Sequence, residues 1–200
     1  MANYNLSGVY DLLLYPFLNK VRQITAQKIL QYKPKSLIDI CCGTGNQLKQ
    51  LTNKDIGLTG IDNSPHMLKN ANELNCYLQD ATDIKFPKGS FDMAIIQLAL
   101  HEKTNDVQQK IVSEIYRIVK KDGYIIVVDY EMGKHTRKSA KYIIYAIEYI
   151  AGKEHYKNFK QYLRNGGINE LFKTPDFRLV EKDNIAGNAM AITIFQKQRD

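Results

Sequence analysis

Residues 36–48 place a short apolar run directly before a glycine-containing turn and the start of a helical pattern. The run Ser36-Leu-Ile-Asp-Ile-Cys41 is typical of a strand that is buried on both faces of a parallel sheet. Gly43 and Gly45 follow, and glycine permits backbone angles that a Cβ would forbid and lets the main chain approach a ligand. The order of strand, glycine turn and helix therefore predicts an α/β fold that binds a nucleotide-like ligand at this turn.

An acidic residue follows at the spacing that a ribose requires. Asp62 closes the apolar run 57–62, and it lies 62 − 43 = 19 residues after Gly43. In nucleotide-binding α/β folds, a carboxylate about 20 residues beyond the glycines accepts hydrogen bonds from the ribose hydroxyls. The sequence therefore predicts a ribose contact at Asp62.

Strand and helix patterns alternate along the chain. We expect strands near 36–41, 57–61, 75–78, 91–97, 123–130, 177–182 and 190–196. Between the fourth and fifth strands, Val107, Ile111, Ile115 and Ile118 form one face of an amphipathic helix. The fold class predicted is α/β, a Rossmann-like doubly wound seven-stranded sheet, mostly parallel with an antiparallel C-terminal hairpin.

Composition limits the remaining classes. Two hundred residues are expected to form one domain, 1–200, without a transmembrane segment or export signal. Three cysteines, an odd number, favour a cytoplasmic protein, and the absence of Cys-x-x-Cys and His-x-x-x-His predicts no metal site. The net charge of +7 is compatible with an anionic partner, but the lysines are dispersed, so no nucleic-acid partner is expected. Nothing in the sequence specifies an oligomeric state.

Several motifs resemble those of class I methyltransferases that depend on S-adenosylmethionine (SAM). Leu37-Ile-Asp-Ile-Cys-Cys-Gly-Thr-Gly45 resembles the first motif of this family, with Cys41 where the first glycine usually stands. Gly60-Ile-Asp-Asn-Ser-Pro-His-Met-Leu68 and Tyr77-Leu-Gln-Asp-Ala-Thr-Asp83 resemble the second and third motifs. Because Cys41 and Leu48 replace the outer glycines of the dinucleotide pattern, SAM is favoured over NAD or FAD as the cofactor.

The resemblance extends from about Tyr10 to Lys197 and implies a cofactor site. Asp39 and the turn are expected at the methionine end, Asp62 at the ribose, and Asp80 with the Ala81 backbone at the adenine edge. The predicted cofactor-binding residues are Asp39, Cys42, Gly43, Gly45, Asp62, Asn63, Met67, Asp80, Ala81 and Gln97.

The acceptor is predicted to be a small molecule. After the fourth strand the chain reads Gln97-Leu-Ala-Leu, not the Asn/Asp-Pro-Pro-Tyr/Phe of nucleic-acid amino-methylating enzymes. Tyr10-Asp-Leu-Leu-Leu-Tyr15 and the pair Asp129-Tyr130 resemble the quinone-biosynthesis-like branch (methyltransferase type 11/25). In that branch, helical segments such as 1–31 and 134–173 form a lid or cap. The predicted substrate-pocket residues are Tyr10, Tyr15, His101, Tyr130 and Tyr145.

His101 is the candidate general base, because imidazole titrates near neutral pH and this residue follows the fourth strand. A histidine at this position is equally compatible with a packing role, and each tyrosine with packing on the core. Two other functions stay open: an NAD-type nucleotide-binding oxidoreductase, and a SAM-binding module without activity.

Overall fold

The structure is a computed structural model that describes residues 7–71 and 73–199, with side chains from Tyr15 onward. The helices are α1 (Ser7–Gln31), α2 (Asn46–Lys49), α3 (Pro65–Leu68), the 3-10 helix η1 (Lys69–Ala71), α4 (Asn105–Ile118), α5 (Lys138–Ala151), α6 (Lys153–Arg164) and α7 (Gly167–Leu171). The strands are β1 (Ser36–Ile40), β2 (Gly57–Asp62), β3 (Cys76–Leu78), β4 (Phe91–Gln97), β5 (Val119–Tyr130), β6 (Phe177–Ile185) and β7 (Met190–Lys197).

The strands form one sheet in the order β3-β2-β1-β4-β5-β7-β6. The first five strands pair in parallel, and β7 pairs antiparallel with both β5 and β6. The order reverses between β1 and β4, which is where a doubly wound sheet binds its ligand. The predicted fold class, including the antiparallel C-terminal hairpin, is confirmed.

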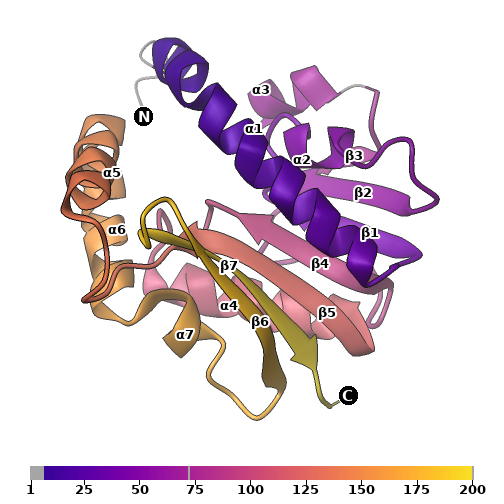
Figure 1. The fold of residues 1–200 in the computed structure, drawn as a ribbon. Helices are drawn as coiled ribbons and strands as arrows, with labels where there is room; N and C mark the ends of the chain where they lie inside the picture. The colour runs from indigo at the N-terminus through magenta and orange to yellow at the C-terminus, as the bar shows by residue number, and fades with distance from the viewer. Residues whose placement is uncertain (1–6, 72, 200) are drawn as a thin grey trace.

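Helices cover both faces of the sheet. In Figure 1, α1 crosses one face, α4 lies behind the sheet, and α5 and α6 stand together to one side. The central strands β1 and β4 are largely buried, and Leu37, Ile38 and Ile95 are fully buried. Helix α4 buries Ile111 and Ile115, on the face that the sequence periodicity predicts.

The boundary before β5 differs from the prediction. The sequence predicts a strand near 123–130, but pairing with β4 already begins at Val119, before the turn-favouring run Lys121-Asp-Gly123. The register with β4 then jumps from Phe91↔Val119 to Met93↔Tyr124, and Asp122 adopts a left-handed backbone with φ 61°. The turn is thus an irregularity inside a longer strand, because the pairing resumes on the same neighbour.

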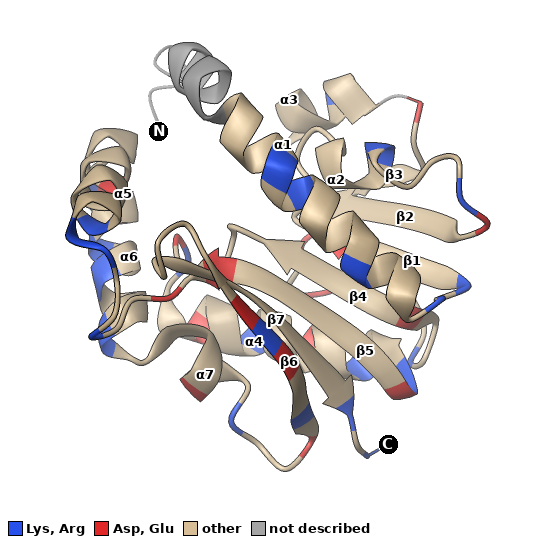
Figure 2. Ribbon diagram, in the orientation of Figure 1, with Lys and Arg blue, Asp and Glu red and all other residues tan. Residues whose placement is uncertain are grey.

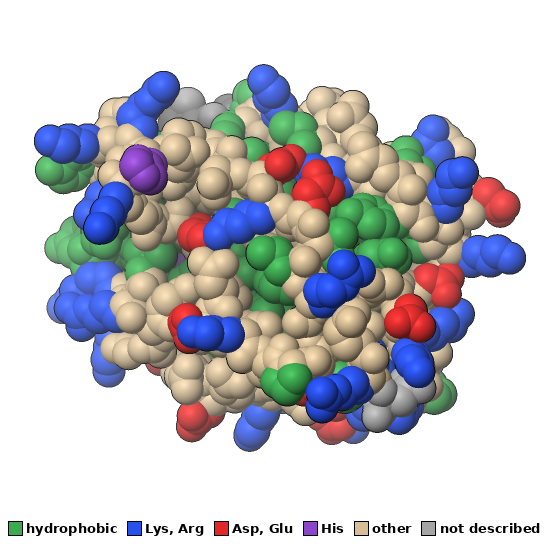
Figure 3. Space-filling model, turned by 60° about the horizontal axis from the view of Figure 1, so that its bottom comes forward, with side chains coloured by type: hydrophobic (Ala, Val, Ile, Leu, Met, Phe, Trp, Pro, Cys, Tyr) green, Lys and Arg blue, Asp and Glu red, His purple; other side chains and the backbone are tan. Residues whose placement is uncertain are grey.

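The surface bears mixed charge. Lys and Arg occur on α1, α5, α6 and several loops (Figure 2). On the face shown in Figure 3 they are interspersed with acidic and hydrophobic side chains. No helix among the described residues is long and apolar enough to cross a bilayer. The segments predicted as a lid or cap coincide with helices α1 and α5 to α7, and their role in closure stays a prediction.

Candidate cofactor-binding site

Two cavities meet at the end of β1. One, of about 290 Å³, lies over the ends of β2 and β3, and the other, of about 340 Å³, lies between the glycine turn and α1. Cys41 lines both of them. The two cavities therefore flank one residue at the carboxyl edge of the parallel sheet, the position predicted for the ligand.

The turn after β1 has three residues in left-handed backbone conformations. They are Cys41 (φ 59°), Gly43 (φ 56°) and Gly45 (φ 70°). The turn is closed by a hydrogen bond from the Gly45 amide to the Cys42 carbonyl at 2.9 Å. Cys41 stands where the family usually has glycine, and a side chain in this conformation costs roughly 1–2 kcal/mol.

Gly43 and Gly45 differ in what surrounds them. A Cβ at Gly45 would lie 2.4 Å from Leu74 Cδ1, whereas a Cβ at Gly43 would meet nothing within 4 Å. Gly43 lines the 340 Å³ cavity, so the open space beside it is space for a ligand. Gly45 instead permits close packing of the turn.

These contacts predict a split between two alanine variants. Both share the left-handed strain, but Gly45→Ala also displaces the terminal methyl of Leu74 and is expected to lower the free energy of unfolding by about 2 kcal/mol. Gly43→Ala is expected to lose about 1 kcal/mol of stability and about tenfold in SAM affinity. Urea denaturation and titration calorimetry measure the two effects. Equal loss of stability in both variants would contradict the assignment.

The 290 Å³ cavity gathers the residues predicted for the adenosine half of the cofactor. Asp62, Asn63, Asp80 and Ala81 all line it. Asp62 Oδ2 accepts from the Gly43 amide at 2.9 Å, and Asp62 Oδ1 accepts from the Ser64 amide at 2.8 Å. Each oxygen retains a lone pair for a ribose hydroxyl. Hydrogen bonds from the Thr82 amide and hydroxyl hold the pKa of Asp80 below its ordinary value, which keeps this carboxylate an acceptor.

The 340 Å³ cavity gathers the residues predicted for the methionine half. Asp39, Cys42, Gly43, Met67 and Gln97 line it, and Tyr15 from α1 does so as well. Of the predicted cofactor-binding residues, Gly45 is the one that lines neither of these two cavities. Asp39 is buried at the end of β1, and this burial, reinforced by the nearby Asp62 charge, raises its pKa to about 8.

Three further polar residues of the cleft were not among the predicted site residues. Arg22 and Gln47 line the methionine-side cavity, and Lys103 lines the adenosine-side cavity. Gln47 Oε1 accepts from Gln97 Nε2 at 2.8 Å, and Gln47 Nε2 donates to the Arg22 carbonyl at 3.3 Å. Arg22 lies on α1, whose position over the turn is set by packing, so no local sequence signal marks it.

The predicted acceptor-side residues form a separate cluster. His101, which lines neither cavity, packs on Tyr130 with ring centroids 4.6 Å apart. Tyr145 joins them through Phe159, at 5.2 Å from its ring. Tyr15 lies apart from this cluster in the methionine-side cavity, and the side chain of Tyr10 is outside the described residues.

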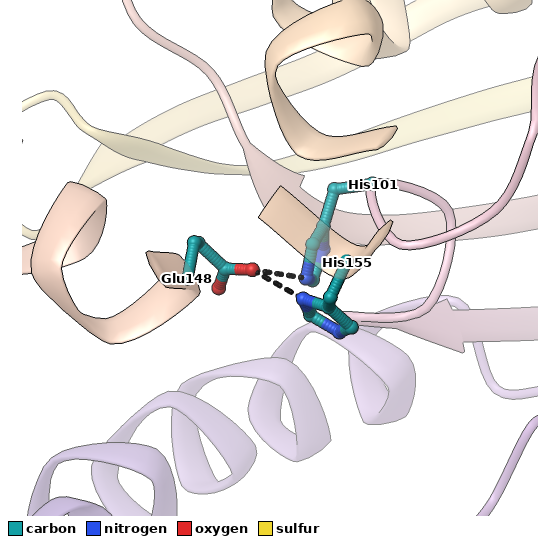
Figure 4. A group of neighbouring side chains, drawn as sticks. All are labelled: His101, Glu148 and His155. Carbon is teal, nitrogen blue, oxygen red and sulfur yellow. Dashed lines mark ion pairs between the residues drawn. The ribbon is translucent and has the colours of Figure 1, made fainter. Parts of the chain in front are cut away.

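His101 is buried and strongly paired. Its Nδ1 lies 2.6 Å from Asp129 Oδ1, and its Nε2 lies 3.6 Å from Glu148 Oε2. Burial opposes the charged form, but the Asp129 carboxylate outweighs it and the pKa of His101 is raised. Glu148 and His155, neither of which the sequence analysis singled out, complete the group in Figure 4.

Residues 38–127 match a protein-family model described as a methyltransferase domain. Residues 38–127 are therefore a methyltransferase domain. It is 24% identical to a demethylmenaquinone methyltransferase of Oceanobacillus iheyensis over 195 residues, covering 86% of this chain and 81% of that protein. It is 30% identical to an uncharacterised methyltransferase of Synechocystis over 115 residues, which is 55% of this chain and 54% of that protein.

Solved structures of methyltransferases share the fold. A SAM-dependent methyltransferase from Methanosarcina mazei has a TM-score of 0.66 at 19% identity, with 86% of this chain and 97% of that chain covered. The plantazolicin methyltransferase BpumL, solved with S-adenosylhomocysteine (SAH), has a TM-score of 0.66 at 16% identity, with 98% and 90% covered. These matches agree with SAM as the cofactor that the sequence predicts, and they give no support to an NAD-type oxidoreductase.

The matches to several relatives are partial. The aligned region spans about half the length of the Synechocystis protein and of an uncharacterised protein of Methanocaldococcus jannaschii. Every predicted cofactor-binding residue that lines one of the two cavities lies within residues 38–127, whereas Tyr15 and Arg22 line the cleft from α1, outside the matched range.

Proposed function

We propose that this protein transfers the methyl group of SAM to a small-molecule acceptor by direct displacement. The observation that carries the proposal is the pair of cavities that meet at Cys41. Acidic acceptors for an adenosine lie on one side, and an acid–arginine pair for an amino-acid zwitterion lies on the other. SAM presents these two halves at its two ends, with the reactive sulfonium between them.

The chain's own residues bind and orient the donor. Asp62 accepts from the ribose hydroxyls, and Asp80 with the Ala81 backbone contacts the adenine edge. Asp39 faces the ammonium of the methionine end and Arg22 its carboxylate. When bound, SAM supplies an electrophilic methyl group, so the protein contributes mainly alignment and exclusion of water.

Two observations favour a small, flat acceptor. Aromatic side chains from β5, α5 and α6 gather beside His101: Tyr130, Tyr145 and Phe159 lie within 5.5 Å of one another in successive ring pairs. One relative bears the name demethylmenaquinone methyltransferase, which makes quinols the first acceptor class to test.

A carbon or hydroxyl acceptor requires a base, and His101 is our candidate. Its Nδ1 is held by Asp129, which leaves Nε2 to take a proton. Asp129 is itself fixed, because it accepts from the Leu100 and Tyr130 amides at 3.0 and 2.7 Å. In this conformation Nε2 faces Glu148 and does not open to either cavity.

Calorimetry followed by a transfer assay tests the proposal. We expect SAM and SAH to bind and NAD not to bind. With SAM labelled in the methyl group, we expect label to appear in a quinol, phenol, thiol or amine and not in RNA or protein. Binding of NAD without SAM would overturn the assignment. Binding of SAM without transfer to any acceptor would instead indicate a non-catalytic module.

A further inference from the structure

Three side chains from separate elements converge outside the cofactor cleft. His101 follows β4, Glu148 lies on α5 and His155 lies on α6, and Figure 4 shows both rings facing the same carboxylate. Glu148 Oε2 is 3.6 Å from His101 Nε2 and 2.8 Å from His155 Nδ1. One donor atom of each residue lies within 4.8 Å of the others. The group thus presents two imidazoles and one carboxylate to a single point.

Glu148 Oε2 and His155 Nδ1 are close to one another but lack a well-aligned hydrogen bond. Glu148 Oε2 and His155 Nδ1 are both buried, and neither forms a hydrogen bond of acceptable geometry with any described residue, although they are 2.8 Å apart. The Glu148 side chain is only 3% exposed. Buried polar atoms are normally hydrogen-bonded, and here the two atoms face one another only as an ion pair, an arrangement that a shared cation would satisfy.

The opposite nitrogen of each ring is anchored on a carboxylate. His101 Nδ1 lies 2.6 Å from Asp129 Oδ1, and His155 Nε2 lies 2.8 Å from Glu102 Oε2. Histidine ligands of metals typically donate their other N–H to a carboxylate in this way, which fixes the tautomer and the ring orientation. Both rings therefore turn an unprotonated nitrogen toward Glu148 when a cation is present.

The separations are compatible with metal coordination. At a metal–ligand distance of about 2.1 Å, the separations of 2.8 and 3.6 Å correspond to angles of about 84° and about 118° at the ion. These values bracket tetrahedral geometry. Two imidazoles and one carboxylate suit zinc and other late divalent ions, and three protein ligands leave a position open.

We propose that His101, Glu148 and His155 bind a divalent transition-metal ion, with zinc the first candidate. The sequence predicted no metal site, because the histidines lack the usual spacing. The ligands come together because α5 packs on α6 and α6 contacts the loop after β4 at Glu102. With the ion bound, His101 Nε2 is a ligand, so the base role proposed for His101 applies only to the metal-free protein. The His101 ring packs against Tyr130 and Phe159, and an oxygen of the acceptor would be the fourth ligand of the ion.

Metal binding by the full chain, expressed without a polyhistidine tag, tests this site independently of methyl transfer. We expect one zinc per chain by elemental analysis, and after chelation one Co²⁺ per chain with the visible absorption of a tetrahedral or five-coordinate site. His155→Ala and the near-isosteric Glu148→Gln are expected to weaken binding roughly 100-fold or more. His135→Ala is the control, because His135 is exposed and lies outside the group.

The competing interpretation is a metal-free network of ion pairs with protonated histidines. Absence of stoichiometric binding by the wild-type chain at micromolar metal would establish that interpretation and overturn ours, as would equal binding by His155→Ala and His135→Ala. Thermal unfolding of each variant without metal identifies any variant that fails to fold. If His155→Ala fails to fold, Glu148→Gln takes its place in the test. SAM calorimetry on the same samples reports separately on the proposed function.

Discussion

Replacing Asp62 with alanine is expected to weaken SAM binding about 100-fold. The carboxylate is positioned to accept from both ribose hydroxyls, and charge-assisted hydrogen bonds contribute roughly 1.5–3 kcal/mol each, so losing the pair costs about 3 kcal/mol. The variant also loses the acceptor for the Gly43 and Ser64 amides, which shape the turn. Titration calorimetry with SAM and SAH measures the change.

Asp83→Ala is the matched control for this experiment. Asp83 lies in the same region but its side chain is 71% exposed and pairs only with Lys85 among the described salt bridges, so SAM affinity should not change. An Asp62→Ala variant that folds normally and binds SAM within threefold of wild type would contradict the ribose assignment. Near-ultraviolet circular dichroism verifies the fold of both variants.

Replacing Asp39 with asparagine is expected to change how stability depends on pH. In the folded protein the pKa of Asp39 is raised to about 8, whereas an unfolded aspartate titrates at about 3.9. Between about pH 4 and pH 8 the folded chain therefore holds a proton that the unfolded chain has released. The contribution of Asp39 to stability consequently falls as pH rises through this window, in total by a few kcal/mol.

Urea denaturation at intervals between pH 5 and pH 8 measures this effect. The free energy of unfolding of Asp39→Asn should decline less with pH than that of wild type, because asparagine does not titrate. Asp83→Asn should follow the wild-type curve. Parallel curves for wild type and Asp39→Asn would show that Asp39 is ionised throughout.

The same substitution should weaken SAM binding at pH 8 by about tenfold or more. The ionised carboxylate is the partner for the ammonium of the methionine end, and asparagine retains the shape without the charge. Wild-type affinity should rise with pH as Asp39 ionises. A variant that is more stable and binds less tightly would indicate that this buried acid is kept for the ligand.

Sequence periodicity predicted most of the fold, because the buried strands are continuous apolar runs and α4 has a regular apolar face. The first motifs likewise predicted the cavity around Asp62 and Asp80, since those residues follow strand ends. Arg22 and Lys103 were not predicted, because their places in the cleft depend on how α1 and the β4–α4 loop pack.

Helix α5 does not bury the face on which its tyrosines lie. Tyr142, Tyr145 and Tyr149 share one face, and an apolar face would ordinarily be buried. Tyr142 and Tyr149 are instead 73% and 68% exposed, while the charged Glu148 is buried. Its burial depends on the two histidines that face it, one before α4 and one on α6, and no local pattern encodes a contact between such distant segments.

Helix α1 has a further consequence for the cofactor cleft. Arg22 stands on the cleft wall, and six residues further along the helix Lys28 pairs with Glu181 and Asp183 on β6, each at 2.5 Å. Glu181 is 153 residues away in sequence and on the outermost strand of the sheet. A substitution that disrupts the C-terminal hairpin would thus shift α1 and weaken binding of the methionine end of the cofactor. No residue of the hairpin lines either of the two cavities.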